Sequence, residues 1–202
     1  MTTHPFNEGT KLAKVFTTLS DGKWHCGKHE LPARNSSAVV MYGGSVDYIE
    51  SFNSSSVNVS GGSLYCLATN QSGSANISGG SIYGFSAYES SSANISGGNV
   101  HELGAGTSST INISGGGADK LYACNFSTVT FYGQNFLLGS GLTFDGYQVL
   151  GTGILSGEWV DGTPWSVNIW GNEPSATIRA IPEPATLLLL GLGAVMLRIR
   201  KH

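Results

Sequence analysis

The sequence predicts an all-β fold: a single-stranded parallel β-helix, or β-solenoid, built from coils of eighteen residues. Three observations lead to this prediction. Glycine pairs stand at positions 61–62, 79–80, 97–98 and 115–116, each eighteen positions after the one before. Apolar residues keep fixed places relative to those pairs, and only 11% of the residues are charged. One such unit cannot bury its apolar side alone, whereas a stack of copies can.

The segment before each glycine pair alternates between apolar and polar residues, which is typical of a strand with one buried face. Aligning the units on the glycine pairs produces two apolar columns. They contain Val57, Ala75, Ala93, Ile111, Val129 and Tyr147, and Val59, Ile77, Ile95, Ile113, Phe131 and Val149. We expect both columns to face the interior of the stack.

The segment after each glycine pair supplies two more apolar columns. They contain Val46, Leu64, Ile82, Val100 and Ala118, and Ile49, Leu67, Phe85, Leu103 and Leu121. The glycine pair itself marks a corner, where positive φ or close backbone approach is needed. No six-residue subrepeat of the kind that suits a left-handed β-helix is present, so right-handed winding is favoured.

The repeat body is assigned to residues 37–171. The same interval extends back to Gly43 and forward to Gly133 and Gly151. A further copy fits at residues 166–171 after a short insertion.

Polar residues on the outward side of the first segment form a surface ladder in this register. They are Asn58, Ser60, Asn76, Ser78, Asn94, Ser96, Asn112 and Ser114. Stacking would bring like residues about 4.8 Å apart. A solvated polar face is the simpler interpretation, and adsorption to ice or another ordered surface is an alternative function for it.

Residues 1–36 do not belong to the repeat. Residues 10–19 are predicted to form a short amphipathic helix. The string from Lys11 to Gly27 resembles the opening of a winged-helix DNA-binding domain, but β repeats follow from Ala38 instead of a recognition helix or wing. The chain also lacks a basic stripe, so nucleic acid is not an expected partner. Residues 1–36 contain no apolar run of the kind that a secretory signal needs.

His25, Cys26 and His29 are potential zinc ligands. A structural zinc site needs four ligands, and no fourth is near them in the sequence. We therefore predict no metal and no cofactor.

Carboxylates in the repeat fall mostly in different columns, which argues against a β-helix carbohydrate-active enzyme, the second alternative function. His101 and Asp119 share a column on adjacent coils, beside Glu102 and Lys120. That group has the residues of a base and its orienting partner, but it is also what exposed ion pairs look like. We predict no catalytic residue and no enzyme.

Trp159, Trp165 and Trp170 gather in the last coils. A solenoid needs a cap, or its last coil would offer an unpaired edge. We expect these residues to cap the core.

The last part of the chain changes composition. Residues 172–181 are expected to be a linker, and residues 182–202 begin Pro-Glu-Pro and continue with a nearly all apolar run at 185–197. Proline suits the first turn of a helix, so a short hydrophobic helix is predicted. It is shorter than the roughly 20 residues that span a bilayer, and could insert at some mismatch cost.

This tail resembles the PEP-CTERM sorting signal of Gram-negative bacteria, which is also labelled an ice-binding protein C-terminal domain. The resemblance rests on the ordered set of Pro182, Glu183 and Pro184, the apolar segment, and the basic residues Arg198, Arg200 and Lys201. It implies recognition of the first three by an exosortase, a membrane protease-transpeptidase, and a stop at the basic residues. Members normally begin with a signal peptide.

The function that we expect is therefore non-enzymatic: a β-solenoid body with a structural or adhesive role, exported and sorted through its tail. The expected partners are an exosortase, a membrane contacted by the C-terminal helix, and an extracellular polysaccharide. The expected location is the membrane during transit, and then the cell surface or the extracellular matrix.

Overall fold

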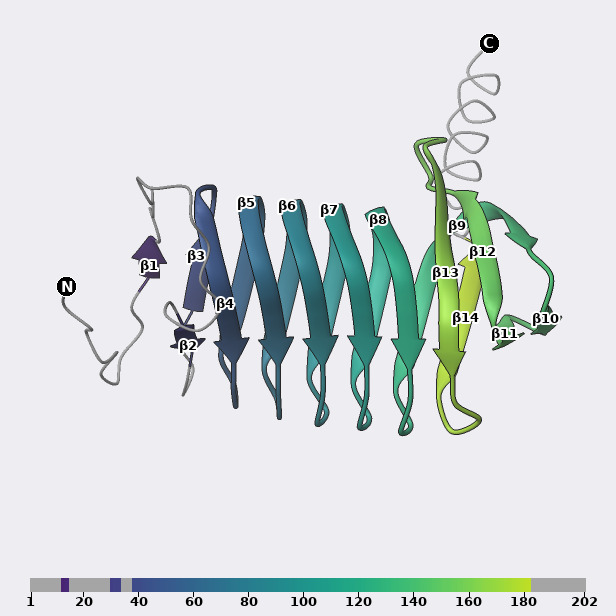
Figure 1. The fold of residues 1–202 in the computed structure, drawn as a ribbon, viewed down its shortest axis with the longest axis horizontal. Coiled ribbons are helices and arrows are strands. Elements are labelled where there is room, and N and C mark those ends of the chain that lie inside the picture. Colours follow the sequence, from purple (N-terminus) through teal and green to yellow (C-terminus); the bar gives the residue numbers. More distant parts are fainter. Residues whose placement is uncertain (1–11, 15–29, 34–37, 183–202) are drawn as a thin grey trace, which may run out of the picture.

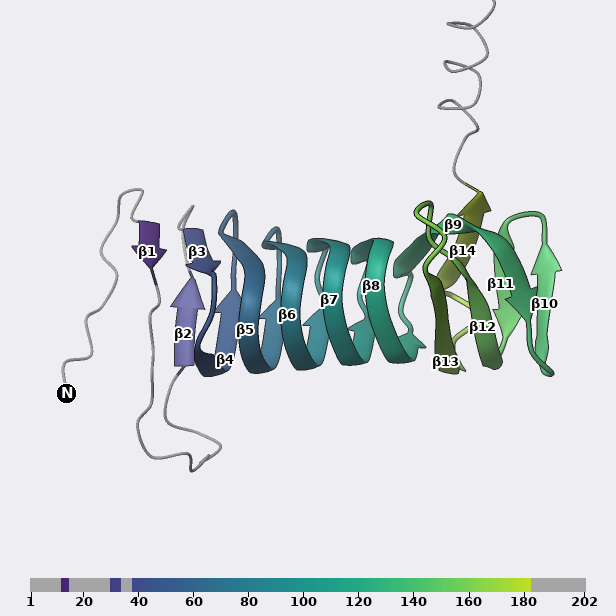
Figure 2. The ribbon, with the colours of Figure 1, turned by 90° about the horizontal axis from the view of Figure 1, so that it is seen from above.

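The computed structural model describes residues 12–14, 30–33 and 38–182, and in these ranges every regular element is a β-strand. The strands form one continuous sheet that winds into an elongated column (Figure 1). Figure 2 shows the coils stacked in a single row, with the irregular strands gathered at the C-terminal end.

The centre of the column consists of four 14-residue strands: β5 (Ser56–Thr69), β6 (Ser74–Ala87), β7 (Ser92–Ala105) and β8 (Thr110–Ala123). Each pairs in parallel with the next at the predicted offset, so that Ile77 lies opposite Ile95. Strands β3 (Ala38–Met41) and β4 (Ser45–Ser51) form the coil before them. In Figure 1 the nearer half of each coil runs downward as the coils advance toward the C-terminus, which is a right-handed winding.

Each central strand bends at its glycine pair, which divides a coil into a first half and a second half. A Cβ at Gly97 would overlap the carbonyl oxygen of Ser78 in the coil before it, and Gly98 has a φ of +79°. The other pairs make the same approach at Gly61, Gly79 and Gly115. The predicted single file of glycines is therefore confirmed for these four coils.

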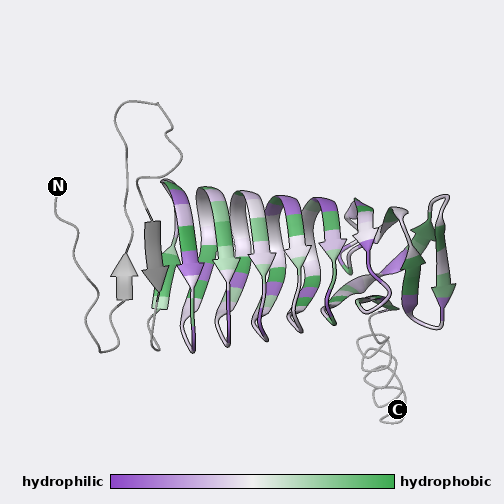
Figure 3. Cartoon of the chain, turned by 60° about the horizontal axis from the view of Figure 1, so that its bottom comes forward, coloured by the Kyte–Doolittle hydropathy of each residue, from purple (hydrophilic) through white to green (hydrophobic). Residues whose placement is uncertain are grey.

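The four predicted apolar columns form the core, and every member is buried except one. Tyr147 was expected to face inward, but it is 62% exposed. It lies between β10 (Leu142–Asp145) and β11 (Gln148–Gly151), which pair as an antiparallel hairpin outside the regular stack. Figure 3 shows that the strands of this hairpin are largely hydrophobic.

Two short strands extend the stack at its N-terminal end. β1 (Leu12–Lys14) pairs in parallel with β3, and β2 (Glu30–Ala33) pairs in parallel with β4. The helix predicted for residues 10–19 is therefore wrong at residues 12–14, which form a strand. β2 lies opposite β4 at the repeat interval, since Glu30 pairs with Tyr48, so the segment assigned outside the repeat contributes to the column.

The regular winding is interrupted after β8. β9 (Thr128–Leu138) begins as the next coil, with Thr128–Phe131 paired in parallel with β8, and then pairs antiparallel with β12 (Gly153–Glu158). β12 in turn pairs antiparallel with β13 (Pro164–Asn172). Gly133 accordingly lies against the backbone of Glu158, so it does not continue the row of glycines formed by the central coils. The C-terminal third is thus not the purely parallel helix that the sequence predicted.

The winding then resumes. Asn168 of β13 pairs in parallel with Lys120 of β8. Partners in the regular coils are one repeat interval apart in the sequence, whereas these two residues are separated by that interval plus thirty inserted positions. β13 therefore occupies the second half of a coil, whereas the copy predicted at 166–171 placed it in a first half. Its Ile169 lies opposite Leu121 rather than in the Ile113 column.

Residues expected to be a linker complete this coil and begin another. The N–H of Glu173 donates to the carbonyl of Ala123 at 3.0 Å, as the N–H of Cys124 donates to Ala105 at 2.9 Å one coil earlier. β14 (Thr177–Pro182) then pairs in parallel with β9 and antiparallel with β11. The prediction of a linker at 172–181 is therefore wrong over this strand.

Two of the three tryptophans close the core as predicted. Trp159 and Trp165 are buried and stack with ring centroids 4.7 Å apart, and Trp165 also stacks on Phe131 at 5.0 Å. Trp170 is 59% exposed and lies against Tyr122 on the outside of the column.

Candidate functional site

The predicted surface ladder lies on the outer side of the first half-coils, where its four asparagines are joined by hydrogen bonds. The Asn76 amide donates to Asn58 Oδ1 at 3.0 Å, Asn94 to Asn76 at 3.1 Å, and Asn112 to Asn94 at 3.2 Å. These distances follow directly from parallel pairing in register, which places identical side chains one strand spacing apart. The asparagine amides therefore satisfy part of one another's hydrogen-bonding capacity.

The serines of the ladder are exposed, but two of them turn toward the backbone. Ser60 Oγ donates to the carbonyl of Met41 at 3.3 Å, and Ser78 Oγ reaches the carbonyl of Val59 at 3.5 Å. Both bonds reach a backbone carbonyl of the coil before the serine. This face therefore presents a lattice whose polar groups partly bind one another.

The outer side of the second half-coils carries a concavity of about 750 Å³, which we call the tyrosine pocket. It is lined by Asp47, Ser63, Leu64, Tyr65, Ser81, Ile82, Tyr83, Asn99, His101 and Asp119. Five of these residues, from Asp47 to Asp119, follow one another at the repeat interval and form one outward column. The pocket is consequently elongated along the axis of the column.

Aromatic rings stack along the middle of this column. The rings of Tyr65 and Tyr83 are parallel, with centroids 5.1 Å apart, and Tyr83 lies at the same distance from the imidazole of His101. Both faces of the Tyr83 ring are therefore covered by neighbours. Because Tyr83 is nevertheless 47% exposed, it presents its ring edge to solvent.

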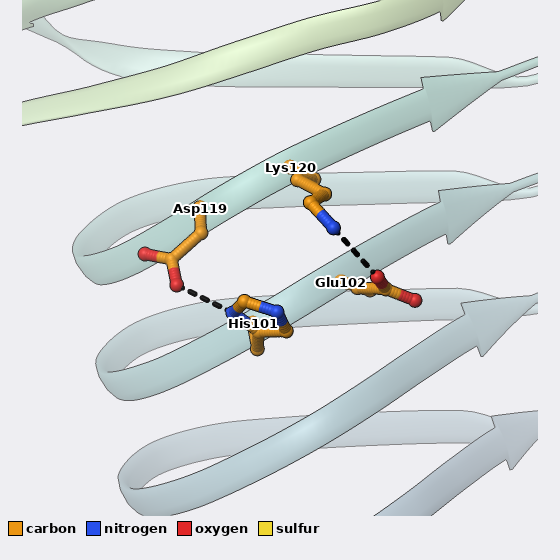
Figure 4. Close-up of polar contacts among 4 residues, drawn as sticks. All are labelled: His101, Glu102, Asp119 and Lys120. Carbon is orange, nitrogen blue, oxygen red and sulfur yellow. Dashed lines mark hydrogen bonds and ion pairs between the residues drawn. The ribbon is translucent and has the colours of Figure 1, made fainter.

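Two ion pairs lie side by side on β7 and β8 (Figure 4), and the residues of the first, His101 and Asp119, line the C-terminal end of the pocket. His101 Nδ1 lies 2.6 Å from Asp119 Oδ2, and Lys120 Nζ lies 3.0 Å from Glu102 Oε1. Because an ionised carboxylate only accepts hydrogen bonds, Nδ1 is the donor in the first contact and Asp119 Oδ2 is the acceptor. The sequence placed these four residues together correctly.

The Lys120–Glu102 pair has a local electrostatic consequence. The hydrogen bond to Glu102, and then its negative charge, raise the pKa of Lys120. The lysine thus stays cationic, although both side chains are nearly half exposed and the pair contributes little to stability.

Sequence reasoning missed the tyrosine pocket as a unit. It singled out His101 and Asp119 but did not extend their column to Tyr83, Tyr65 and Asp47. The repeat interval would have found all three. The concavity itself depends on side-chain shape and could not be found in this way.

Pro182, the first residue of the predicted sorting motif, is the last residue of β14 and is exposed. It lies opposite Gly133 of β9. Glu183, Pro184, the predicted C-terminal helix and the basic residues Arg198, Arg200 and Lys201 lie outside the described residues. The folded body therefore extends to the first residue of the motif.

The tail is the part of the chain that matches a known family. Residues 180–201 match the family model of the PEP-CTERM protein-sorting motif. The chain carries a PEP-CTERM sorting motif. This motif implies export and sorting through an exosortase, as the resemblance led us to expect. No curated protein and no solved structure gives a significant match to the chain.

Membrane-spanning helices and metal sites are both missing from residues 12–14, 30–33 and 38–182. Within these ranges, no helix is long and apolar enough to cross a membrane. In the same part of the chain, no group of three or more His, Cys, Asp or Glu side chains is placed to hold a metal ion. His25, Cys26 and His29 lie outside it.

Proposed function

We propose that this protein is sorted to the cell surface or the extracellular matrix of a Gram-negative bacterium, where its β-solenoid serves as a structural or adhesive module. The observation that carries the proposal is the PEP-CTERM motif at residues 180–201, which begins within β14, the last strand of the repeat body. In transit the tail would anchor the protein in the membrane until an exosortase removes it.

A non-enzymatic body is supported by the spacing of the carboxylates in the tyrosine pocket. Asp47 and Asp119 lie four coils apart in the repeat register, and four rungs amount to about 19 Å. Paired carboxylates that hydrolyse glycosidic bonds lie within about 10 Å of each other. This separation argues against a glycoside hydrolase mechanism that uses these two groups.

Adsorption to ice through the Asn/Ser ladder has less support. A regular ladder is present, as that function would require. However, its asparagine amides bind one another, and Ser60 and Ser78 bind the backbone. The groups that would have to order surface water are thus partly engaged within the protein.

The sorting proposal is tested by replacing the motif at the native locus of the producing bacterium. In the variant with Pro182→Ala, Glu183→Ala and Pro184→Ala, we expect the uncleaved protein to stay with the membrane fraction, whereas the wild type loses its tail and reaches the surface. Pro174→Ala changes an exposed proline in the preceding turn and is the matched control. Cell fractionation with immunoblotting measures both size and location. An unchanged fate of the triple variant would refute the proposal.

A further inference from the structure

We infer that the tyrosine pocket binds a neutral glycan chain that lies along the axis of the column. The inference deepens the adhesive role proposed above, on which it rests, by naming the site and the chemistry of its ligand. It starts from the elongation of the pocket, whose lining extends from Asp47 to Asp119 over consecutive coils. Because the backbone of the site repeats from coil to coil, the site suits a polymer made of repeating units, such as a glycan chain.

The lining has the chemistry that hydroxyl-rich ligands need. Ser63, Ser81 and Asn99 supply small groups that both donate and accept hydrogen bonds, and Asp47 supplies an acceptor. Tyr83 combines apolar ring surface with a phenol hydroxyl. Binding sites for small organic groups typically combine apolar surface with a few polar groups in this way.

The stacking of the aromatic rings limits how a sugar can bind. Because Tyr65 and His101 cover the two faces of Tyr83, a pyranose ring cannot stack on that tyrosine. Contact is left to the ring edge and the hydroxyl. Recognition at Tyr83 therefore depends on hydrogen bonding and not on ring stacking.

Other polymers fit the pocket less well. An extended peptide that binds by strand addition needs a free sheet edge, but β5, β6 and β7 pair with a strand on each side. A polyanion such as nucleic acid or an acidic polysaccharide would meet the carboxylates of Asp47 and Asp119 at the two ends. A neutral glycan meets neither obstacle.

The test is affinity gel electrophoresis of the full chain in mild detergent. The gels contain hydroxyethyl cellulose, barley β-glucan, xylan, galactomannan or dextran as neutral probes, and alginate or polygalacturonate as acidic ones. We expect at least one neutral probe to retard the wild type. Tyr83→Phe keeps the ring stack and removes the hydroxyl, so it should weaken that binding about three- to tenfold, as expected for one hydrogen bond.

Tyr83→Ser removes the ring as well and should weaken binding further. Tyr88→Ser is the matched control, because Tyr88 is also exposed but does not line the pocket. Thermal melts check that all variants are folded. The inference is overturned by failure of every neutral probe to retard the wild type, by retardation with acidic probes alone, or by unchanged binding of both Tyr83 variants. None of these outcomes bears on sorting, which is measured in cells.

Discussion

At the corner of each central coil, a glycine lies directly against a carbonyl oxygen of the coil before it. This contact, rather than backbone flexibility, explains why Gly61, Gly79, Gly97 and Gly115 recur. Their φ angles are not positive, in contrast to those of the glycines that follow them. The first glycine of each pair is therefore required by close packing and the second by conformation.

Replacement of Gly97 by alanine tests this steric account. The new Cβ would overlap the carbonyl oxygen of Ser78, and overpacking of this kind costs about 1–3 kcal/mol of the free energy of unfolding. Gly43 occupies the same place one coil before Gly61, but a Cβ there would meet no atom of the described residues within 4 Å. Gly43→Ala should therefore leave stability unchanged or raise it slightly. Urea unfolding measures both, and equal effects of the two substitutions would contradict the account.

Single residues in the regular coils were predictable because one interval fixes their environment. Ile95 is buried because Ile77 and Ile113 lie on either side of it in register. His101 meets Asp119 for the same reason. Tyr147 was misplaced because the interval was continued through a segment that does not follow it.

At the scale of elements, the insertion between β9 and β13 limited what the sequence could predict. It contains the strands β10 to β12, which pair antiparallel with their neighbours, and the apolar residues of a strand do not reveal that direction. Periodicity identifies a strand but not its direction or its partner. β14 was missed because its short sequence lacks the glycine pair that marks the other coils.

The role of β14 as a structural strand gives a further prediction. Ile178 is fully buried between Val129 and Val149, so Ile178→Ala should lower the free energy of unfolding by about 2–5 kcal/mol. Arg179 is its exposed neighbour, and Arg179→Ala should have little effect. Urea denaturation followed by circular dichroism provides the measurement. A loss below about 0.5 kcal/mol for Ile178→Ala would mean that this strand does not contribute to the fold.

At the scale of the whole molecule, the two outer faces of the column carry different surface features. The first half-coils carry the self-bonded asparagine ladder, and the second half-coils carry the tyrosine pocket. The repeat register predicted the ladder and both ion pairs. It could not predict the pocket, because a concavity arises from the sizes of neighbouring side chains and not from their spacing alone.

The central claim is that coils of eighteen residues stack in register, and a pair of deletions tests it most directly. Deleting residues 74–91 removes one whole coil and joins Gly73 to Ser92, so every column remains aligned. Deleting residues 74–82 removes half a coil and places polar residues in the apolar columns. The measurement is the thermal melt of the two variants by circular dichroism. We predict a cooperative melt for the whole-coil deletion and none for the half-coil deletion, whereas equal behaviour of the two variants would contradict the stacked-coil structure.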